Sequence, residues 1–485
     1  MYEEYETKEA IPEAASMIET FRAIGYSLET AIADIIDNSI TACAKHITIQ
    51  RDWNGGKPII TIKDDGVGMT NDELILAMRP GAQNPLAERD EKDLGRFGLG
   101  LKTASFSQCR KLTVISKKNE ITSYWTWDLD FVAECKKWNL IRWCPDDFKD
   151  ALNDVTSGTI VIWSELDRII PTNTDSTNDV AKEKFSRALD KVRIHLSMTF
   201  HRFIEDKQIS IVWGSHAISP WNPFCPTENK RQPFPVDYLP EGVTLTGFVL
   251  PHKLNFSNET EYHLAEGPNG WSGQQGFYVY RGKRLLLSGD WLGLFRKEEC
   301  YKLARIAIDL PNSQDAKWQI DIKKSKAYPP TYCREQIEQY TKKVRSAAEE
   351  VFRHRGKILK QRSGQQFYPL WLEKKKDSNW SYVINRENPL VLHLKKLAET
   401  GSSEAINQML LLIESCVPVK TIFINEAKDE DRHDANKILD ETIIKQTAKA
   451  MYDSFLNQGK SSLQAKALLK IIEPFNYYED IIDSF

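Results

Sequence analysis

The sequence predicts an α+β protein with about three domains. The chain has 485 residues, which is more than one hydrophobic core usually holds. Its first part mixes helical spacing of apolar residues with short β-like runs, whereas residues 363–485 show mainly helical spacing. A proline-rich stretch around 216–240 separates two α/β parts. We therefore expect domains at 1–215, 216–362 and 363–485.

Composition limits the partners and the compartment. A net charge of −3 gives the whole chain no attraction to nucleic acid or anionic lipid, so DNA contact requires a local basic patch. Its eight cysteines form no CxxC pair, which is typical of reduced thiols. The acidic start is unlike a signal peptide, and no apolar run is long enough to cross a bilayer. These features predict a cytoplasmic protein without a membrane partner.

The order of predicted elements supports the fold class. In the first domain we expect helices at 13–24, 27–44 and 181–204, and strands at 46–51, 58–63, 111–117, 121–128 and 159–163. Residues 70–94 are polar and predict irregular structure. The second domain predicts strands at 244–250, 276–281 and 304–309 and a helix at 331–360. Helices at 389–399, 403–415 and 434–472 complete the chain.

Asp34, Asp37 and Asn38 lie in one predicted helix. Because Asp34 and Asn38 are four residues apart, we expect their side chains on one helical face. The amide oxygen of Asn38 suits Mg²⁺, which prefers hard oxygen ligands. Asp34 can orient or deprotonate a water molecule, and Asp37 can hold a metal-bound water. Taken alone, this spacing is also typical of the polar face of an amphipathic helix.

A second block follows the strand predicted at 58–63. Asp64 at the strand end can accept a hydrogen bond from an adenine amino group. Gly66 and Gly68 let the backbone turn tightly beside the base, and Met69 closes the block as a further candidate contact. An ordinary Asp-Gly turn is the alternative interpretation.

A third block is rich in glycine and reads Gly95-Arg96-Phe97-Gly98-Leu99-Gly100-Leu101-Lys102. Its glycines let backbone amides converge on an anion. A helix expected after Gly100 presents its positive end to phosphate, and Lys102 adds a charge. A flexible surface loop is the alternative.

Taken together and in this order, the three blocks resemble the nucleotide site of the GHKL ATPases, the group of DNA gyrase B, MutL proteins, heat-shock chaperones and histidine kinases. The glycine-rich block looks most like the MORC branch and its bacterial relatives. The resemblance implies a GHKL (Bergerat) α/β sandwich domain that binds ATP and Mg²⁺. It also implies that Thr159 supports Asp64, and that residues 70–97 form a lid over the nucleotide.

Asp34 departs from the family pattern, because hydrolysing members usually carry Glu at this position. The shorter side chain places the carboxylate farther from the attacking water, and catalysis is sensitive to displacements of about 1 Å. We therefore expect a slow, switch-like ATPase.

In MutL, gyrase B and MORC-type proteins, a second domain with an S5-like fold sends a lysine to the γ-phosphate. The segment 318–325 looks like that loop, so the resemblance implies an S5-like transducer domain at 216–362 with Lys324 or Lys323 in this role. A solvated lysine pair is the alternative. Nearby, Arg281, Lys283 and Arg284 are expected to be exposed, with contact to a DNA backbone as the alternative.

The resemblance further implies an ATP-dependent homodimer that closes as a clamp on DNA. Bacterial MORC relatives are associated with restriction and anti-phage defence operons, which implies an operon-encoded effector or nuclease partner. A chaperone-like protein-remodelling ATPase and a noncatalytic nucleotide sensor in a larger complex are the alternatives. Residues 363–485 are expected to serve dimerisation or partner docking.

Overall fold

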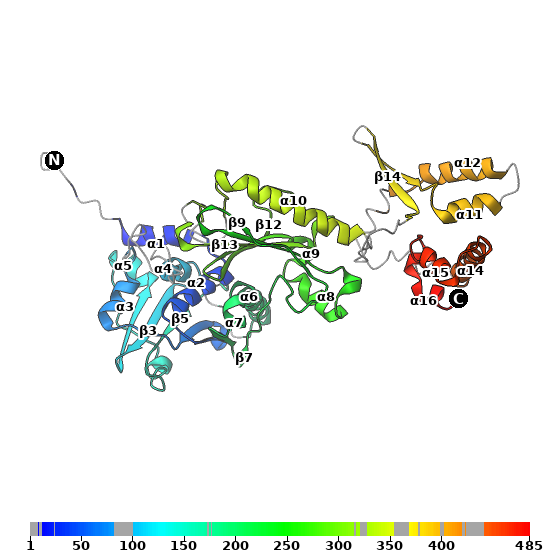
Figure 1. Cartoon of the computed structure of the whole chain (residues 1–485). Coiled ribbons are helices and arrows are strands. Elements are labelled where there is room, and N and C mark those ends of the chain that lie inside the picture. The colour runs from blue at the N-terminus through cyan, green and yellow to red at the C-terminus, as the bar shows by residue number, and fades with distance from the viewer. Residues whose placement is uncertain are drawn as a thin grey trace. The chain divides into compact units, whose positions relative to one another are not determined.

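The computed structural model describes residues 8, 12–23, 25–81, 100–171, 174–175, 177–314, 317–320, 327–353, 368–376, 379–397, 402–419, 422 and 441–485. The chain forms two compact units, Met1–Ile358 and Leu359–Phe485 (Figure 1). Helices and strands are mixed as the α+β prediction requires. The division into three domains stays a prediction.

The first sheet of unit Met1–Ile358 orders its strands β4-β3-β5-β2-β1-β6-β7. Their bounds are β1 His46–Asp52, β2 Ile59–Asp64, β3 Lys111–Lys118, β4 Ile121–Asp128, β5 Gly158–Ser164, β6 Ser210–Trp213 and β7 His216–Ala217. β1 and β6 run parallel, whereas the other neighbours are antiparallel. β2, which ends at Asp64, thus lies inside the sheet between β5 and β1.

The helices that share a core with this sheet are α1 Ala14–Ala23, α2 Leu28–Thr41, α4 Gly100–Phe106 and α6 Asp179–Thr199. Three further helices, α3 Asn71–Met78, α5 Leu129–Cys135 and α7 His201–Glu205, also contribute buried residues to this core. α2 contacts both α4 and α6, so it is the central helix of this layer.

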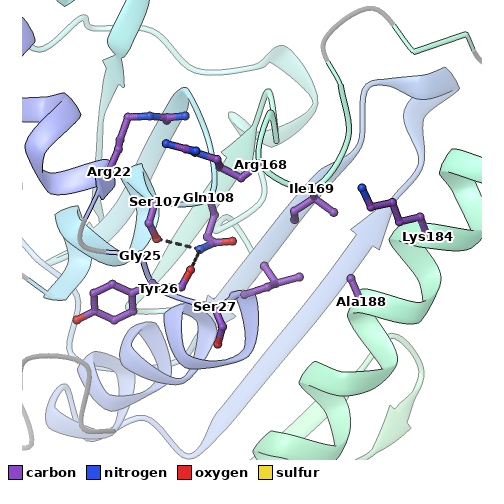
Figure 2. A pocket seen from close by; sticks show the side chains of 11 residues that line it. Arg22, Gly25, Tyr26, Ser27, Ser107, Gln108, Arg168, Ile169, Lys184 and Ala188 are labelled. Carbon is purple, nitrogen blue, oxygen red and sulfur yellow. Dashed lines mark hydrogen bonds between the residues drawn. The ribbon is translucent and has the colours of Figure 1, made fainter.

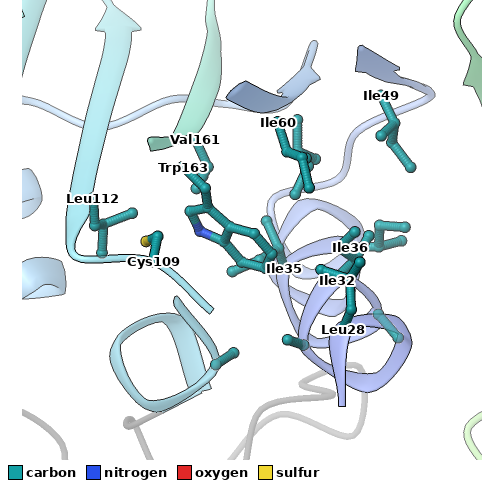
Figure 3. Packing of buried hydrophobic residues seen from close by; sticks show 14 of the residues in the cluster. Leu28, Ile32, Ile35, Ile36, Ile49, Ile60, Cys109, Leu112, Val161 and Trp163 are labelled. Atoms are coloured by element: carbon teal, nitrogen blue, oxygen red, sulfur yellow. The ribbon is translucent and has the colours of Figure 1, made fainter. Parts of the chain in front are cut away.

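Side chains point alternately to the two faces of the sheet, and this alternation separates two hydrophobic clusters. On β5, Val161 and Trp163 join the helix-side core, whereas Ile160 and Ile162 join a cluster on the other face. Figure 3 shows the helix-side core, where isoleucines of α2 meet residues of the sheet. Ile32, for example, is fully buried, which contributes about 1.5–3 kcal/mol. This packing fixes the rotation of α2, and with it the direction of its polar side chains.

Two sequence expectations in this unit were wrong. Residues 70–94 were expected to be irregular, but α3 begins after Thr70, whose side chain and that of Glu73 form a capping box. The first part of the expected 70–97 lid is therefore helical. Residues 82–94 lie outside the described residues. The helix expected at 181–204 is interrupted at Phe200, which separates α6 from α7.

A second sheet in the same unit has the order β12-β11-β13-β10-β8, with β9 also paired to β10. Its strands are β8 Gln232–Pro233, β9 Asp237–Tyr238, β10 Thr244–Val249, β11 Gly276–Arg281, β12 Arg284–Asp290 and β13 Ala304–Leu310. The associated helices are α8 Glu259–Glu266, α9 Gly270–Gly273 and α10 Thr331–Arg353. α10 packs on β10 and shares the buried core of this sheet.

Unit Leu359–Phe485 contains helices close to those expected at 389–399 and 403–415, together with a hairpin that the sequence did not predict. The single helix expected at 434–472 is wrong, because residues 458–461, which include Gly459 at φ +83°, separate two helices there. Residues 434–440 lie outside the described residues. The strands are β14 Trp371–Lys376 and β15 Asn379–Ile384. The helices are α11 Pro389–Leu397, α12 Ser402–Ser415, α14 Glu441–Asn457, α15 Ser462–Leu469 and α16 Glu479–Asp483. Its core is built mainly from α14, α15 and α16. Among the helices of the described ranges, none is long and apolar enough to cross a membrane.

Candidate nucleotide site

α2 begins at its N-cap Ser27, whose side chain accepts from the Thr30 amide, and carries the first predicted block. Asp34 and Asp37 are buried, with only 5% and 1% of their surface exposed, whereas Asn38 is exposed. The helix thus buries two carboxylates and leaves one amide oxygen open to a ligand.

Asp34 is held by groups from two other segments. The hydroxyl of Tyr26 donates to Oδ2 of Asp34 at 3.0 Å, and Nη2 of Arg284 lies 3.6 Å from Oδ1. Burial and the Asp34 charge raise the pKa of Tyr26, which keeps its phenol protonated as a donor. A Cβ atom built at Gly100 would lie 3.9 Å from Asp34 Oδ2, so the first residue of α4 adjoins this carboxylate.

The backbone of Tyr26 is itself anchored. Figure 2 shows the Gln108 amide bonded to the Tyr26 carbonyl at 3.0 Å and to the Ser107 hydroxyl at 2.9 Å. Gln108 and Ser107 are both buried. Because the donor is fixed at its backbone, the position of the Asp34 carboxylate is also restrained.

Asp64 sits at the end of β2 with only 6% of its surface exposed. The hydroxyl of Ser39 donates to its Oδ2 at 2.8 Å, and the amide of Gly66 donates to its Oδ1 at 3.0 Å. Burial raises the pKa of Asp64, while these two hydrogen bonds act in the opposite direction. The Asp64 carboxylate is thus a fixed, buried hydrogen-bond acceptor, and it retains the capacity to accept a hydrogen bond from a ligand.

Thr159 is the strand partner of Asp64 in the β2–β5 register. Its hydroxyl lies 2.9 Å from that of Ser116, and Ser116 Oγ accepts from the amide of Met69 at 2.8 Å. Met69 and Thr159 are therefore linked through Ser116. Sequence reasoning missed both Ser39 and Ser116, because no spacing rule singles out a lone serine.

Two glycines allow the chain to turn beside Asp64. Gly68 has φ +66°, and a Cβ there would lie 1.9 Å from the carbonyl oxygen of Lys117. Gly158 has φ +153°, and its Cβ would lie 2.3 Å from the carbonyl oxygen of Asp64. Any larger residue would force these strand ends apart.

The third block is described only in part. Gly95, Arg96, Phe97, Gly98 and Leu99 lie outside the described residues, as do Lys323 and Lys324. Gly100, Leu101 and Lys102 open α4. Lys102 is buried and donates from Nζ to the carbonyl of Ala77 in α3 at 2.9 Å, and burial lowers its pKa to about 8. Its contact with phosphate stays a prediction.

The structure corrects one expectation about the basic hairpin. Arg281 and Arg284 are buried, with 2% and 4% of their surface exposed, so they are not solvated surface residues. Nε of Arg284 donates to Asp37 Oδ2 at 3.0 Å and to Oδ1 at 3.2 Å. A residue of the second sheet therefore reaches the helix that carries the first block.

Two cavities lie near this region. One of about 380 Å³ opens beside Tyr26 and Ser27, with Arg168 and Lys184 on its wall (Figure 2). The other, of about 1060 Å³, is lined mainly by apolar side chains, among them Trp125 and Trp127. Asp34, Asn38 and Asp64 line neither of them.

Comparison with known proteins agrees with this geometry. Residues 26–159 match the family of histidine kinase-, DNA gyrase B- and HSP90-like ATPases. The chain is 33% identical to the DNA mismatch repair protein MutL of Histophilus somni over 252 residues, which are 49% of this chain and 38% of that protein. It is 34% identical to MutL of Pasteurella multocida over 100 residues, 20% of this chain and 16% of the relative.

A third relative is MutL of Shewanella loihica, which is 35% identical over 98 residues, 20% of this chain and 15% of its own length. The chain thus matches less than two thirds of the length of these relatives. The particular closeness to MORC-type proteins stays a prediction. The matched range contains the acids of α2, the β2 end and Thr159, so residues 26–159 form a domain of the GHKL ATPase type.

Proposed function

We propose that this protein is a Mg²⁺-dependent ATP-binding protein and a slow ATPase that works as a nucleotide-driven switch. The proposal rests mainly on two buried acids, Asp64 and Asp34, each of which is held in place by neighbouring groups. Asp64 is fixed at a strand end by Ser39 and Gly66, and Asp34 lies against the first residue of α4.

Adenine recognition is assigned to the β2 end. The Asp64 carboxylate offers an acceptor to the exocyclic amino group of adenine, which guanine lacks at the equivalent position. Gly66, Gly68 and Met69 would form the backbone wall beside the base, and Thr159 would support the acid. Buried polar acceptors of this kind give strong discrimination, because the wrong base leaves them unpaired.

The phosphate end is assigned to α2 and to the start of α4. Asn38, with its exposed amide oxygen, fits the hard-oxygen preference of Mg²⁺, which would neutralise charge on the phosphate oxygens. The glycine-rich block with Leu101 and Lys102 would surround the phosphates. Asp34 would orient the attacking water and accept its proton, whereas Asp37 is committed to Arg284. Lys324 or Lys323 would reach the γ-phosphate from the second domain.

The switch would act by lid closure and ATP-dependent homodimerisation, forming a clamp on DNA. Support comes from the relatives, which are named DNA mismatch repair proteins, and from the second sheet docked on the nucleotide domain in one unit. An operon-encoded effector or nuclease in a restriction or anti-phage defence system would supply cutting chemistry. Residues 363–485 would then serve dimerisation or partner docking.

Binding of a fluorescent ATP analogue, with and without Mg²⁺ and in competition with ATP or GTP, tests the core of the proposal. We expect Mg²⁺-dependent binding that ATP displaces much better than GTP. Failure to bind adenine nucleotides would refute the proposal.

The clamp requires its own tests. Sedimentation with a nonhydrolysable ATP analogue should shift the protein from monomer to dimer. DNA binding should weaken steeply as salt rises, since phosphate contacts release counterions. A monomer under all conditions would exclude the clamp while leaving nucleotide binding intact.

One observation favours a second candidate, a noncatalytic nucleotide sensor. Asp34 is shorter than the usual Glu, is buried, and already contacts Tyr26 and Arg284. Single-turnover measurements separate the two candidates, because a sensor would bind ATP without releasing phosphate.

A further inference from the structure

We propose that Arg284 is a positioning residue through which the second sheet controls Asp34, so that movement of the β11–β12 hairpin changes turnover without contact to the nucleotide. The inference rests on the proposed function, in which Asp34 acts on the attacking water. It assigns a regulatory task to a residue outside the three sequence blocks and outside residues 26–159.

The hairpin tip contacts the nucleotide domain at two places. Gly282 and Lys283 both have positive φ, +53° and +71°, which is the geometry of a tight two-residue turn that suits a hairpin. Nζ of Lys283 lies 2.6 Å from Asp206 Oδ2, immediately after α7. Leu285 shares a buried cluster with Met198 of α6. The tip therefore contacts α6 through a buried apolar side chain and the end of α7 through a partly exposed ion pair.

Arg284 extends from this tip toward α2 and contacts both acids. Its Nε bonds both oxygens of Asp37, and its Nη2 lies 3.6 Å from Asp34 Oδ1. Its Nη1 donates to the carbonyl of Leu285 at 2.9 Å, which fixes the guanidinium plane on its own strand. One rigid, planar group thus connects the hairpin backbone to the predicted base.

The surroundings make this connection strong. Arg284 is buried, and the Phe200 ring centroid lies 5.9 Å from its guanidinium carbon. Charges interact more strongly where water is excluded. Burial lowers the pKa of nearby His195 to about 4, with Arg284 acting in the same direction, so this imidazole is neutral near pH 7. The charges paired with Arg284 are therefore Asp37 and Asp34.

A purely structural role accounts poorly for this arrangement. Burying an ion pair costs much desolvation energy, and apolar residues of similar volume often stabilise a protein equally well. Here the guanidinium lies near Oδ1 of Asp34, whereas the Tyr26 hydroxyl bonds Oδ2. Because catalysis responds to displacements of about 1 Å, a small shift of the hairpin would alter the base.

The test compares Arg284→Met and Arg284→Lys with wild type. The matched control is Arg187→Met on α6, where the arginine pairs with Glu183 and is 75% exposed. For each protein we would measure the Kd for a nonhydrolysable ATP analogue, kcat, KM and the unfolding midpoint. Arg284→Met should lower kcat by about tenfold or more, since the base is released, and leave Kd within about twofold. Arg284→Lys should recover part of kcat, and the control should match wild type.

A double-mutant cycle with Asp34→Asn gives a readout that lost stability would not reproduce. If Arg284 acts through Asp34, Arg284→Met should have little further effect on the residual turnover of Asp34→Asn. Additive losses, unchanged kcat, or parallel losses of kcat and nucleotide affinity would each overturn the inference. Should Arg284→Met fail to fold, the same cycle with Arg284→Lys decides.

The results of these experiments distinguish a failure of the Arg284 inference from a failure of the proposed ATPase function. A wild type that hydrolyses ATP through Asp34, with Arg284 variants of normal kcat, would overturn the inference alone. A wild type without ATP turnover would overturn both the ATPase proposal and this role of Arg284.

Discussion

The hydroxyl of Ser39 donates a 2.8 Å hydrogen bond to Oδ2 of Asp64 and so joins α2 to the end of β2. Both residues are buried. The bond fixes the helix that carries Asp34 relative to the strand that carries the expected adenine acceptor. Together with the bond from the Val67 amide to the Ala42 carbonyl at 3.0 Å, it helps set the distance between the two ends of the proposed site.

Ser39→Ala should lower both stability and nucleotide affinity. Removing the hydroxyl leaves a buried carboxylate oxygen with one hydrogen bond fewer, which costs about 1–3 kcal/mol. Urea unfolding gives the stability change, and titration with an ATP analogue gives the affinity. Ser215→Ala, at an exposed serine, is the control and should stay within about 0.5 kcal/mol of wild type. Equal effects of the two changes would contradict a role for the Ser39–Asp64 bond.

Asp34→Asn should retain ATP binding and lose turnover by about a hundredfold or more, because an amide cannot accept the proton of the attacking water. Its isosteric shape preserves the Tyr26 contact, since the amide oxygen still accepts. Phosphate release under saturating ATP measures the effect. The control is Asp190→Asn at an exposed site on α6. Unchanged turnover in Asp34→Asn would show that another group acts as the base.

Gly68→Ala should destabilise the protein far more than Gly81→Ala. Both glycines have nearly the same positive φ, +66° and +68°, so the backbone strain of the two changes is similar. The two sites differ in the room they leave for a side chain. A Cβ at Gly68 would lie 1.9 Å from the Lys117 carbonyl oxygen, whereas a Cβ at Gly81 would have no atom within 4 Å. We expect about 1 kcal/mol for Gly81→Ala. Thermal unfolding of the two variants measures the difference. Equal midpoints would exclude a steric clash at Gly68.

Lys102 predicts a specific pH dependence of stability. Burial lowers its pKa in the folded protein to about 8 from 10.5. Between these values the lysine is neutral when folded and charged when unfolded, so the unfolded state binds more protons and stability rises with pH. Below about pH 8 the buried charge opposes folding, and above 10.5 both states are neutral.

Comparison of wild type with Lys102→Met isolates this contribution. The free energy of unfolding of wild type relative to the variant should increase by up to about 3 kcal/mol across that window. Urea titrations at several pH values provide the measurement, with the exposed Lys191→Met as the control for the change of side chain. A difference that does not vary with pH would mean that Lys102 is not titrating in this range.

Local chemistry made much of the first domain predictable. Isoleucines at helical spacing behind Ser27 determine α2, and short runs of β-branched and aromatic residues determine β2 and β5, because these patterns depend only on near neighbours. The Thr70–Glu73 capping box was also present in the sequence, although its helix was not predicted. The hairpin of β14 and β15 escaped prediction because its lysine-rich strand lacks apolar alternation.

By itself, therefore, the sequence determined most elements of the first domain and identified Asp34 and Asp64 as candidate site residues. Only the tertiary structure decided which groups hold those acids. Ser39 meets Asp64 across 25 positions, and Arg284 meets Asp37 across 247. Such pairs arise when packed layers bring distant segments together, and no periodicity along the chain specifies them.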